Sequence, residues 1–260
     1  VIGEDKLEGK NIVIATGAKP RELNIPGKKY LTTSREFMEI KKLPENIVFV
    51  GGGYISFEFA HIAARAGSKC IILQRGGQPL KNFDSDLVND LIKSSKLEGI
   101  EVYTDTEVEE ISKQNNKLIV KTNNDIPKNF IGDLVVHGAG RVPEIDDLEL
   151  KRGNVKKDRK GVAVNEFLQS SSNKRVYAAG DCTNIGMPLT PVASLEAEIV
   201  VENILEGNNR KINYTGIPSV VFTIPPLASV GITEKSVEEE HEVIYKNRNE
   251  WYTSERLNYK

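Results

Sequence analysis

Three consecutive glycines, Gly51 to Gly53, stand between a short apolar run and a segment with helical periodicity. The apolar run IVFV begins at Ile47, the helical segment begins at Tyr54, and a second apolar run, CIILQ, begins at Cys70. A buried strand, a glycine turn, an amphipathic helix and a second buried strand form a βαβ unit. This order predicts a doubly wound α/β domain, and it is the strongest constraint that the sequence places on the fold.

The glycine turn has the spacing of a loop that binds the pyrophosphate of a dinucleotide. Gly51 would allow the sharp turn from strand to helix, and Gly53 would let the backbone come close to the phosphates. The following helix presents free N–H groups and a partial positive charge at its N-terminus. A tight turn without a ligand is the alternative, but the flanking strand and helix favour a dinucleotide site. Ser56 stands where the G-x-G-x-x-G pattern has its third glycine. The predicted loop comprises Gly51, Gly52, Gly53, Tyr54, Ile55 and Ser56.

The residues after the second apolar run predict which dinucleotide binds. An acid about 20 residues past the glycine loop usually binds the ribose 2′-hydroxyl of NADH, whereas a nearby arginine accommodates the 2′-phosphate of NADPH. This sequence has the neutral Gln74 followed by Arg75, and Lys81 stands in the loop beyond them. A guanidinium binds phosphate through strong, geometrically selective hydrogen bonds. We therefore predict NADP as a cofactor, with NADPH preferred over NADH; the alternative is that both cations are solvated surface residues.

Helical periodicity and capping residues predict four helices. Their expected ranges are 30–45, 54–66, 84–98 and 193–205. In the first helix, Ser34 is expected as the N-cap and Pro44 as the stop. The second helix is expected to bury one apolar face, which consists of Ile55, Phe59, Ile62, Ala63 and Ala66. From about residue 213 the strand-like segments no longer alternate with helices, which predicts a separate antiparallel unit.

The composition argues against several classes of partner. The net charge is −2 and the pI about 6.1, so the sequence offers no basic surface to nucleic acid or anionic lipid. No apolar run approaches the length of a membrane-spanning helix, and the first residues lack a signal-peptide layout. Cys70 and Cys182 form neither a disulfide framework nor a metal motif. We therefore expect no nucleic-acid, membrane or metal site, and a reducing, cytoplasmic location.

Five further segments follow one another in a specific order: IVIATGAKP, GAGRVPEI, VYAAGDCTN, MPLTPVASLEAEIVVENI and IPSVVFTIPPLASVGITE. Together with the glycine loop they resemble the flavin-dependent pyridine nucleotide–disulfide oxidoreductases. The resemblance implies Rossmann-type domains for FAD and NAD(P), the second inserted in the first, and the start of an α+β dimerisation domain. Asp181 matches the aspartate that hydrogen-bonds the ribityl chain of FAD in that family. The other residues implied at the flavin or at the domain crossover are Thr16, Gly17, Gly140, Arg141, Gly180, Leu189, Thr190, Pro191, Val192 and Ala193.

Within the family the sequence is most similar to glutathione reductase and its trypanothione-reducing relative. Tyr54 matches an aromatic residue that lies over the flavin there and moves aside for nicotinamide, and Glu58 matches an acid that contacts nicotinamide. The implied reaction passes hydride from NADPH through FAD to a redox disulfide, and on to a small disulfide such as glutathione disulfide. Dihydrolipoyl dehydrogenase, mercuric reductase and NADH oxidase share the scaffold and remain alternatives, as does a non-catalytic dinucleotide-binding module.

The sequence does not contain the family's motifs for the disulfide chemistry. It lacks the C-x-x-x-x-C pair, the first glycine loop for FAD and the C-terminal histidine–glutamate motif. His61, His137 and His241 are expected to be structural or solvated, so no catalytic residue is predicted. We expect the middle of a longer, homodimeric subunit that alone is inactive and binds FAD weakly or not at all. The expected domains are a partial flavin domain at 1–30 and 138–212, a nucleotide domain at 31–137, and the start of a dimerisation domain at 213–260.

Overall fold

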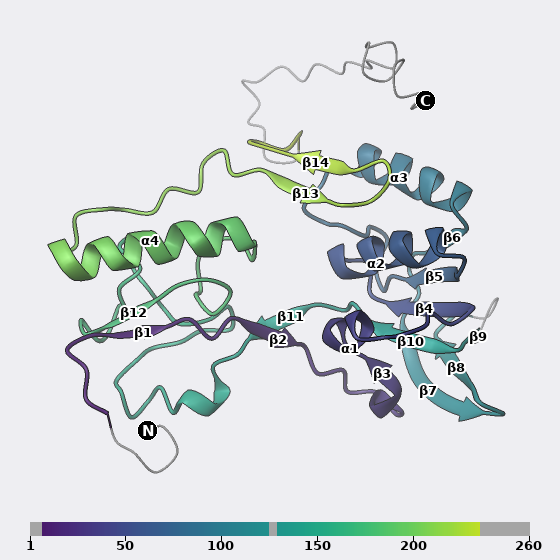
Figure 1. Ribbon diagram of the computed structural model, residues 1–260, viewed down its shortest axis with the longest axis horizontal. Coiled ribbons are helices and arrows are strands. Elements are labelled where there is room, and N and C mark those ends of the chain that lie inside the picture. Colours follow the sequence, from purple (N-terminus) through teal and green to yellow (C-terminus); the bar gives the residue numbers. More distant parts are fainter. Residues whose placement is uncertain (1–6, 125–128, 235–260) are drawn as a thin grey trace, which may run out of the picture.

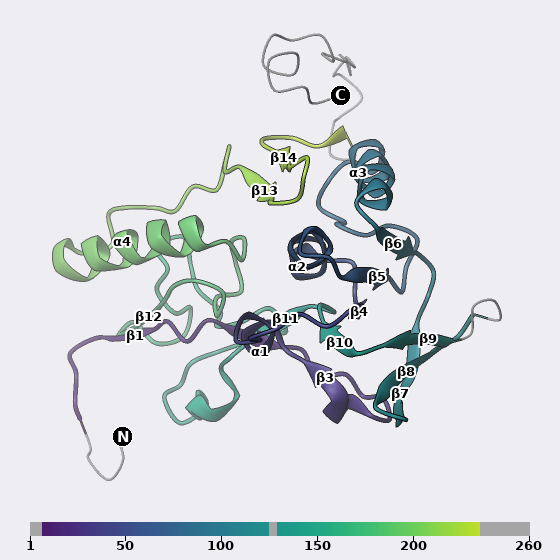
Figure 2. The same cartoon turned by 45° about the vertical axis from the view of Figure 1, so that its right-hand side comes forward.

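The computed structural model describes residues 7–124 and 129–234 (Figure 1). Its largest sheet has five parallel strands in the order β3-β10-β4-β5-β6. These strands are β3 (Leu31–Thr32), β4 (Asn46–Val50), β5 (Lys69–Leu73), β6 (Ile100–Tyr103) and β10 (Leu134–His137). Helices α2 (Tyr54–Arg65) and α3 (Ser85–Leu97) connect β4 to β5 and β5 to β6, and both cover the same face (Figure 2). The predicted α/β class is confirmed.

Strand β4 is buried on both faces, which is why its sequence is an uninterrupted apolar run. Ile47 and Phe49 point to the helices and belong to the same core as Phe57 of α2. Val48 and Val50 point the other way and pack on a three-stranded antiparallel sheet. That sheet consists of β7 (Val108–Gln114), β8 (Lys117–Thr122) and β9 (Asn129–Gly132).

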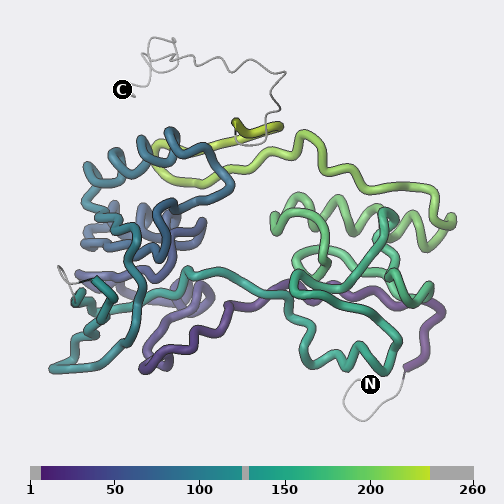
Figure 3. The backbone as a smooth tube through the Cα atoms, turned by 180° about the vertical axis from the view of Figure 1, so that it is seen from behind, coloured from purple at the N-terminus to yellow at the C-terminus, as the bar shows by residue number. Residues whose placement is uncertain are grey.

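A second, smaller half of the molecule lies beside the half that contains these two sheets. Strand β1 (Ile12–Ile14) pairs in parallel with β12 (Val176–Ala178), and α4 (Thr190–Glu206) packs over them. The chain passes between the two halves along β2 (Ala18–Pro20) and β11 (Arg141–Pro143), which pair antiparallel. Figure 3 shows these purple and teal segments side by side where the halves join. The remaining elements are α1 (Ser34–Met38), η1 (Lys28–Tyr30), η2 (Asp146–Leu148) and the hairpin strands β13 (Ser219–Val221) and β14 (Leu227–Ser229).

The first helix is capped by Thr33 and not by Ser34, so the predicted N-cap is wrong. The Thr33 hydroxyl accepts a hydrogen bond from the backbone N–H of Glu36 at 3.4 Å, and the Glu36 carboxylate accepts one from Thr33 N at 2.7 Å. This reciprocal capping box requires an acid or amide three residues after the cap, which only Thr33 has. The helix ends at Met38, before the predicted stop at Pro44.

The buried face of α2 also differs from the predicted apolar face. Its buried residues are Ser56, Phe57, Ala60, His61 and Ala63. Ile62 is 59% exposed and Ala66 is exposed as well, so the predicted face is wrong. The prediction counted apolar residues only. In the fold, the small Ser56 packs against Gly138 after β10, and the polar His61 is hydrogen-bonded to Ser95 of α3, so both are buried although neither is apolar.

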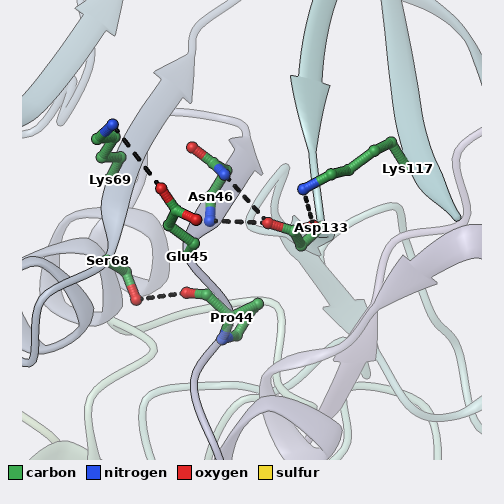
Figure 4. A network of polar contacts seen from close by, with 7 residues as sticks. All are labelled: Pro44, Glu45, Asn46, Ser68, Lys69, Lys117 and Asp133. Atoms are coloured by element: carbon green, nitrogen blue, oxygen red, sulfur yellow. Dashed lines mark hydrogen bonds and ion pairs between the residues drawn. The ribbon is translucent and has the colours of Figure 1, made fainter.

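Hydrogen bonds and an ion pair at the amino end of β4 connect the parallel sheet to the antiparallel sheet (Figure 4). Asp133, between β9 and β10, accepts hydrogen bonds from the backbone N and the side-chain Nδ2 of Asn46, each at 3.1 Å. Lys117 Nζ lies 2.5 Å from the other carboxylate oxygen. Nearby, Ser68 Oγ donates to the carbonyl of Pro44 at 2.7 Å. The Lys117 ammonium, and then Asn46, lower the pKa of Asp133.

Asp133→Ala is expected to destabilise the fold by about 2 kcal/mol, because it leaves the N–H groups of Asn46 without an acceptor. Since the folded state lowers the pKa of Asp133, this stabilisation is present above the pKa of an unfolded aspartate, about 3.9, and is lost as the pH falls below it. Urea unfolding of both proteins at neutral and at acidic pH measures the effect. The difference in unfolding free energy between the wild type and Asp133→Ala should be smaller at acidic pH. An equal difference at both pH values would contradict a contribution from the charged carboxylate.

Candidate functional site

A cavity of about 690 Å³ opens at the carboxyl ends of β4, β5 and β10. Open α/β sheets bind their ligands at this edge, because the loops that follow the strands converge there. The glycine loop forms one wall, and the chain between the two halves forms another. The residues that line it are 21–25, 50–54, 73–76, 78, 80–82, 106–108 and 138–140.

The structure itself requires a glycine at position 51 but not at position 53. Gly51 has φ +101°, and a Cβ there would lie 2.5 Å from Ala139 Cα and 2.6 Å from the carbonyl oxygen of Gly138. Gly53 is the N-cap of α2 with φ −99°, and a Cβ there would meet only Gly138 O, at an ordinary 3.5 Å. The space beside Gly53 is therefore free, and no side chain caps the helix N-terminus beside it. This geometry suits the predicted close approach of phosphates.

Ser56 lies one turn into α2, where the strands and the helix are closest. A Cβ on Gly138 would lie 2.0 Å from Ser56 Oγ, so the two residues pack without spare room. Ser56 is fully buried, and its hydroxyl has no hydrogen-bond partner within the described residues. These contacts agree with the predicted role of a small residue at the third position of the pattern.

The side chain of Gln74 holds the glycine loop through hydrogen bonds, a role that the sequence did not indicate. Its Oε1 accepts a hydrogen bond from the backbone N of Gly52 at 3.0 Å, and its Nε2 donates to the carbonyl of Gln78 at 3.3 Å. A side-chain amide can do both at once, whereas a carboxylate has no proton to donate. Gln74 thus ties the glycine loop to the loop after β5, and its side chain is already engaged there.

The two cations of the predicted 2′-phosphate site, Arg75 and Lys81, line the same cavity. The Arg75 side chain is 76% exposed, and its Nη1 lies 3.7 Å from Oε1 of Glu107. An ion pair this long and exposed holds the guanidinium weakly, so Arg75 is available to an incoming anion. Glu107 comes from the segment before β7 and was not predicted as a site residue. Arg75 and Glu107 are far apart in the sequence, so no local pattern indicates that they form an ion pair.

The crossover between the halves supplies the opposite wall. Gly140 lines the cavity with φ +102°, and Arg21, which the sequence did not single out, lies beside it. Arg141 was predicted beside the dinucleotide; its guanidinium instead donates to the carbonyl of Ala18 within the β2–β11 ribbon. It is not among the residues that line the cavity.

The neutral ring of His137 forms hydrogen bonds with the backbone of the crossover wall of the cavity. The N–H of Ala139 donates to Nδ1 at 3.1 Å, so Nε2 carries the proton and donates to the carbonyl of Arg21 at 2.5 Å. Both ring nitrogens are used by the backbone, which agrees with the predicted structural role of His137.

Two predicted nicotinamide residues lie at the start of α2. Tyr54 lines the cavity, and its hydroxyl lies beside Ser219 of the hairpin. Burial raises the pKa of this phenol. Glu58, one turn later, points to the hairpin, where its Oε1 accepts a hydrogen bond from Phe222 N at 3.0 Å. Ile55 is half-buried and does not line the cavity.

The predicted flavin residues converge in the other half of the molecule. Because β1 and β12 are parallel and pair Ile14 with Ala178, the segments after them, Thr16-Gly17 and Gly180-Asp181, leave the same sheet edge. The N-terminus of α4 meets them there, since a Cβ on Gly180 would lie 3.4 Å from the Cβ of Ala193. The structure thus brings together three segments that the resemblance implied at FAD. They are 16–17, 180–181 and 189–193.

Helix α4 begins at Thr190, three residues before the predicted start at 193. Pro191 stands in its first turn, where a missing N–H costs no helical hydrogen bond, so this proline belongs inside the helix. The predicted start overlooked that preference. As a consequence the free N–H groups of the helix belong to the turn that contains Ala193, which lies against Gly180.

Glu196 holds these segments from within the core, and the sequence did not single it out. It is 1% exposed and accepts hydrogen bonds from Gly180 N and from the Tyr214 hydroxyl, both at 2.6 Å. Burial raises the pKa of this carboxyl. The two bonds fix the turn that carries Asp181, which gives the predicted flavin segment a rigid support.

A family model described as pyridine nucleotide-disulphide oxidoreductase matches residues 2–197. The chain belongs to this family. The predicted family and its class, flavoprotein oxidoreductases, are therefore confirmed. Membership also supports FAD and a pyridine nucleotide as the family's cofactors.

Several relatives align over nearly all of the chain. The mercuric reductase of Lysinibacillus sphaericus is 32% identical over 90% of the chain and 43% of its own length. The glutathione reductase of Nostoc sp. is 31% identical over 90% of the chain and 53% of its own length. The solved structure of the HOCl-induced flavoprotein disulfide reductase RclA from Escherichia coli superimposes with a TM-score of 0.81, at 28% identity, over 91% of the chain and 54% of that structure. The chain thus spans about half the length of these relatives.

Neither cysteine of this family member is placed for redox chemistry. Cys70 is 1% exposed inside β5, where burial raises the pKa of its thiol to about 12, and Cys182 is fully buried. Reactive thiols are exposed thiolates, so these two are structural.

We expect neither thiol to react with an aromatic disulfide reagent in the native protein at mildly alkaline pH, and both to react after unfolding in urea. The release of the coloured thiolate, followed with time, measures the reaction. Fast modification of either cysteine without urea would contradict the buried placement seen here.

Three further predictions concern a metal site, a membrane span and His241. Residues 7–124 and 129–234 contain no group of three or more His, Cys, Asp or Glu that could hold a metal ion. Within the same residues, no helix has both the length and the apolar character to span a membrane. His241 lies outside the described residues.

Proposed function

We propose that the chain carries the NADPH site and part of the FAD site of a flavin-dependent disulfide reductase. One observation supports this most strongly: the glycine loop, Arg75 and Lys81 line one cavity at the carboxyl edge of the parallel sheet. The free space beside Gly53 would take the pyrophosphate, with the helix N-terminus behind it. Arg75 would exchange the weak contact with Glu107 for the 2′-phosphate. No acidic residue stands at position 74 to prefer a free ribose hydroxyl.

The residues at the edge of β1 and β12 would hold FAD. FAD, when bound, would accept hydride from NADPH and pass electrons to a disulfide. Asp181 would accept a hydrogen bond from a flavin hydroxyl, and Thr16, Gly17 and the first turn of α4 would approach the cofactor. Within this proposal the partial flavin domain is 1–30 and 138–212, the nucleotide domain is 31–137, and the start of the dimerisation domain is 213–260.

The substrate class we propose is a small disulfide such as glutathione disulfide, handled by a homodimer in the cytoplasm. The relatives named glutathione reductase and trypanothione reductase support a disulfide. A mercuric reductase is as similar, so the family's members differ in the acceptor. A non-catalytic dinucleotide-binding module would account for the cavity but would give no role to the flavin segments that converge at α4.

Titration of the chain with NADPH and with NADH, followed by nicotinamide fluorescence, tests the dinucleotide part. A direct guanidinium–phosphate contact is expected to give at least about tenfold tighter binding of NADPH, which corresponds to about 1.4 kcal/mol. Equal affinities would reject the assignment of Arg75 and Lys81 to a 2′-phosphate. A complete lack of binding of both would reject the dinucleotide site itself.

A further inference from the structure

Three side chains on one face of α2 bind the same short segment of the hairpin. They are Tyr54, Glu58 and His61, whose spacing of four and three residues places them one above the other. The Tyr54 hydroxyl lies beside Ser219, and Glu58 Oε1 accepts a hydrogen bond from Phe222 N at 3.0 Å. His61 Nδ1 accepts from Ile224 N at 3.3 Å. Figures 1 and 2 both show β13 beside α2.

The hydrogen bonds around His61 fix its tautomer. The Ser95 hydroxyl donates its proton to the carbonyl of Leu91 at 2.7 Å, so it can only accept from the ring. His61 Nε2, at 3.0 Å from Ser95 Oγ, therefore carries the ring proton. This leaves Nδ1 as an acceptor, which is what the N–H of Ile224 requires. The ring is 2% exposed, and both of its nitrogens are satisfied only in this neutral form.

His61 thus joins three elements that are distant in the sequence. It connects α2 to Ser95 of α3 on one side and to Ile224 of the hairpin on the other. Phe222 and Ile224 are two residues apart, and both direct their N–H groups at α2. Because the segment is short, a change at Ile224 must also move the N–H that holds the Glu58 carboxylate.

We infer that His61 is a positioning residue for the nicotinamide half of the dinucleotide. It holds the segment 219–224 on α2, and this segment in turn fixes the carboxylate of Glu58 and borders Tyr54, which lines the cavity. The inference rests on the proposed NADPH site, and on the family resemblance, which implies that Tyr54 and Glu58 contact nicotinamide. It gives a role to a buried histidine that touches neither cofactor site.

Two substitutions separate the two nitrogens of the ring. In His61→Asn the amide oxygen replaces Nδ1 and can still accept from Ile224 N–H, while the contact with Ser95 is lost. In His61→Gln the amide nitrogen replaces Nε2 and can still donate to Ser95, while the acceptor for Ile224 is lost. Amide hydrogen exchange at Phe222 and Ile224 reports the hairpin contact. Affinities for NADPH and for 2′,5′-ADP, which lacks nicotinamide, report the cofactor contact, and thermal unfolding verifies that both variants fold.

His61→Gln is expected to speed exchange at both amides by about fivefold or more, as the loss of one hydrogen bond implies. It should weaken NADPH by a similar factor and leave 2′,5′-ADP unchanged, whereas His61→Asn should stay near the wild type in both. Equal effects of the two variants on exchange, or equal weakening of both ligands by His61→Gln, would overturn the inference. A wild-type chain that binds neither ligand would overturn the proposed function instead, and the exchange rates would still decide whether His61 holds the segment.

Discussion

Gly51→Ala is expected to destabilise the chain by about 3 kcal/mol or more, whereas Gly53→Ala is expected to leave its stability nearly unchanged and to remove dinucleotide binding. At position 51 an alanine would adopt φ +101°, which costs about 1–2 kcal/mol. Its Cβ would also lie 2.5 Å from Ala139 Cα, and relieving such overpacking typically costs about 1–3 kcal/mol more. At position 53 the backbone is ordinary and the added methyl would occupy only the free space of the cavity.

Urea unfolding and NADPH titration of both variants measure these effects. The matched pair separates the two reasons for a glycine, since one residue is required by the protein and the other by the ligand. If Gly53→Ala bound NADPH as tightly as the wild type, the phosphates would not lie beside that residue. If Gly51→Ala were as stable as the wild type, the turn would have another conformation than the one described here.

Arg75→Glu is expected to weaken NADPH by about 100-fold, or about 3 kcal/mol, and to leave NADH within a fewfold of its original affinity. The substitution removes a charge-assisted contact to the 2′-phosphate and places a carboxylate beside it and beside Glu107. NADH carries no phosphate at that position, so it should be almost insensitive. Fluorescence titrations with both nucleotides measure the change in preference.

Arg152→Glu is a suitable control, because it makes the same change in net charge at an exposed residue that does not line the cavity. It should affect neither nucleotide beyond a general electrostatic effect, which added salt would remove. An equal loss of NADPH and NADH affinity in Arg75→Glu would count against the phosphate contact. A similar loss in the Arg152 variant would show that the overall charge of the chain, and not Arg75, sets the preference.

The structure also explains why the choice between NADPH and NADH cannot be predicted from residue 74 alone. The sequence shows at this position only that no acid is present, whereas in the fold Gln74 is hydrogen-bonded to Gly52 and Gln78 and holds the loop in place. Its contribution to cofactor choice is therefore indirect, through the shape of the glycine loop. Under the proposed function, Arg75 would contact the 2′-phosphate directly, and the phosphate would replace its contact with Glu107.

Local patterns were sufficient to predict the strand, glycine turn and helix from Ile47 onward. A buried parallel strand is apolar along its whole length, and the turn at Gly51 combines a positive φ with no room for a Cβ, so both are visible in a few adjacent residues. The order of the flavin segments was also visible, and the matching family model confirmed the family that this order implied. Local patterns failed where a choice depended on partners elsewhere, as with the cap at Thr33 and the buried face of α2.

By itself, the sequence determined the class of fold, the position of the glycine loop and the family, because each depends on neighbouring residues in a fixed order. Only the tertiary structure decided how Glu58 and His61 are used, since their partners Phe222 and Ile224 lie more than 160 positions away. The same holds for Gln74 beneath the loop and for Glu107 beside Arg75. Hydrogen bonds and ion pairs form between groups that the folded chain brings within about 3–4 Å of each other. A short stretch of sequence does not show which distant residues will come that close.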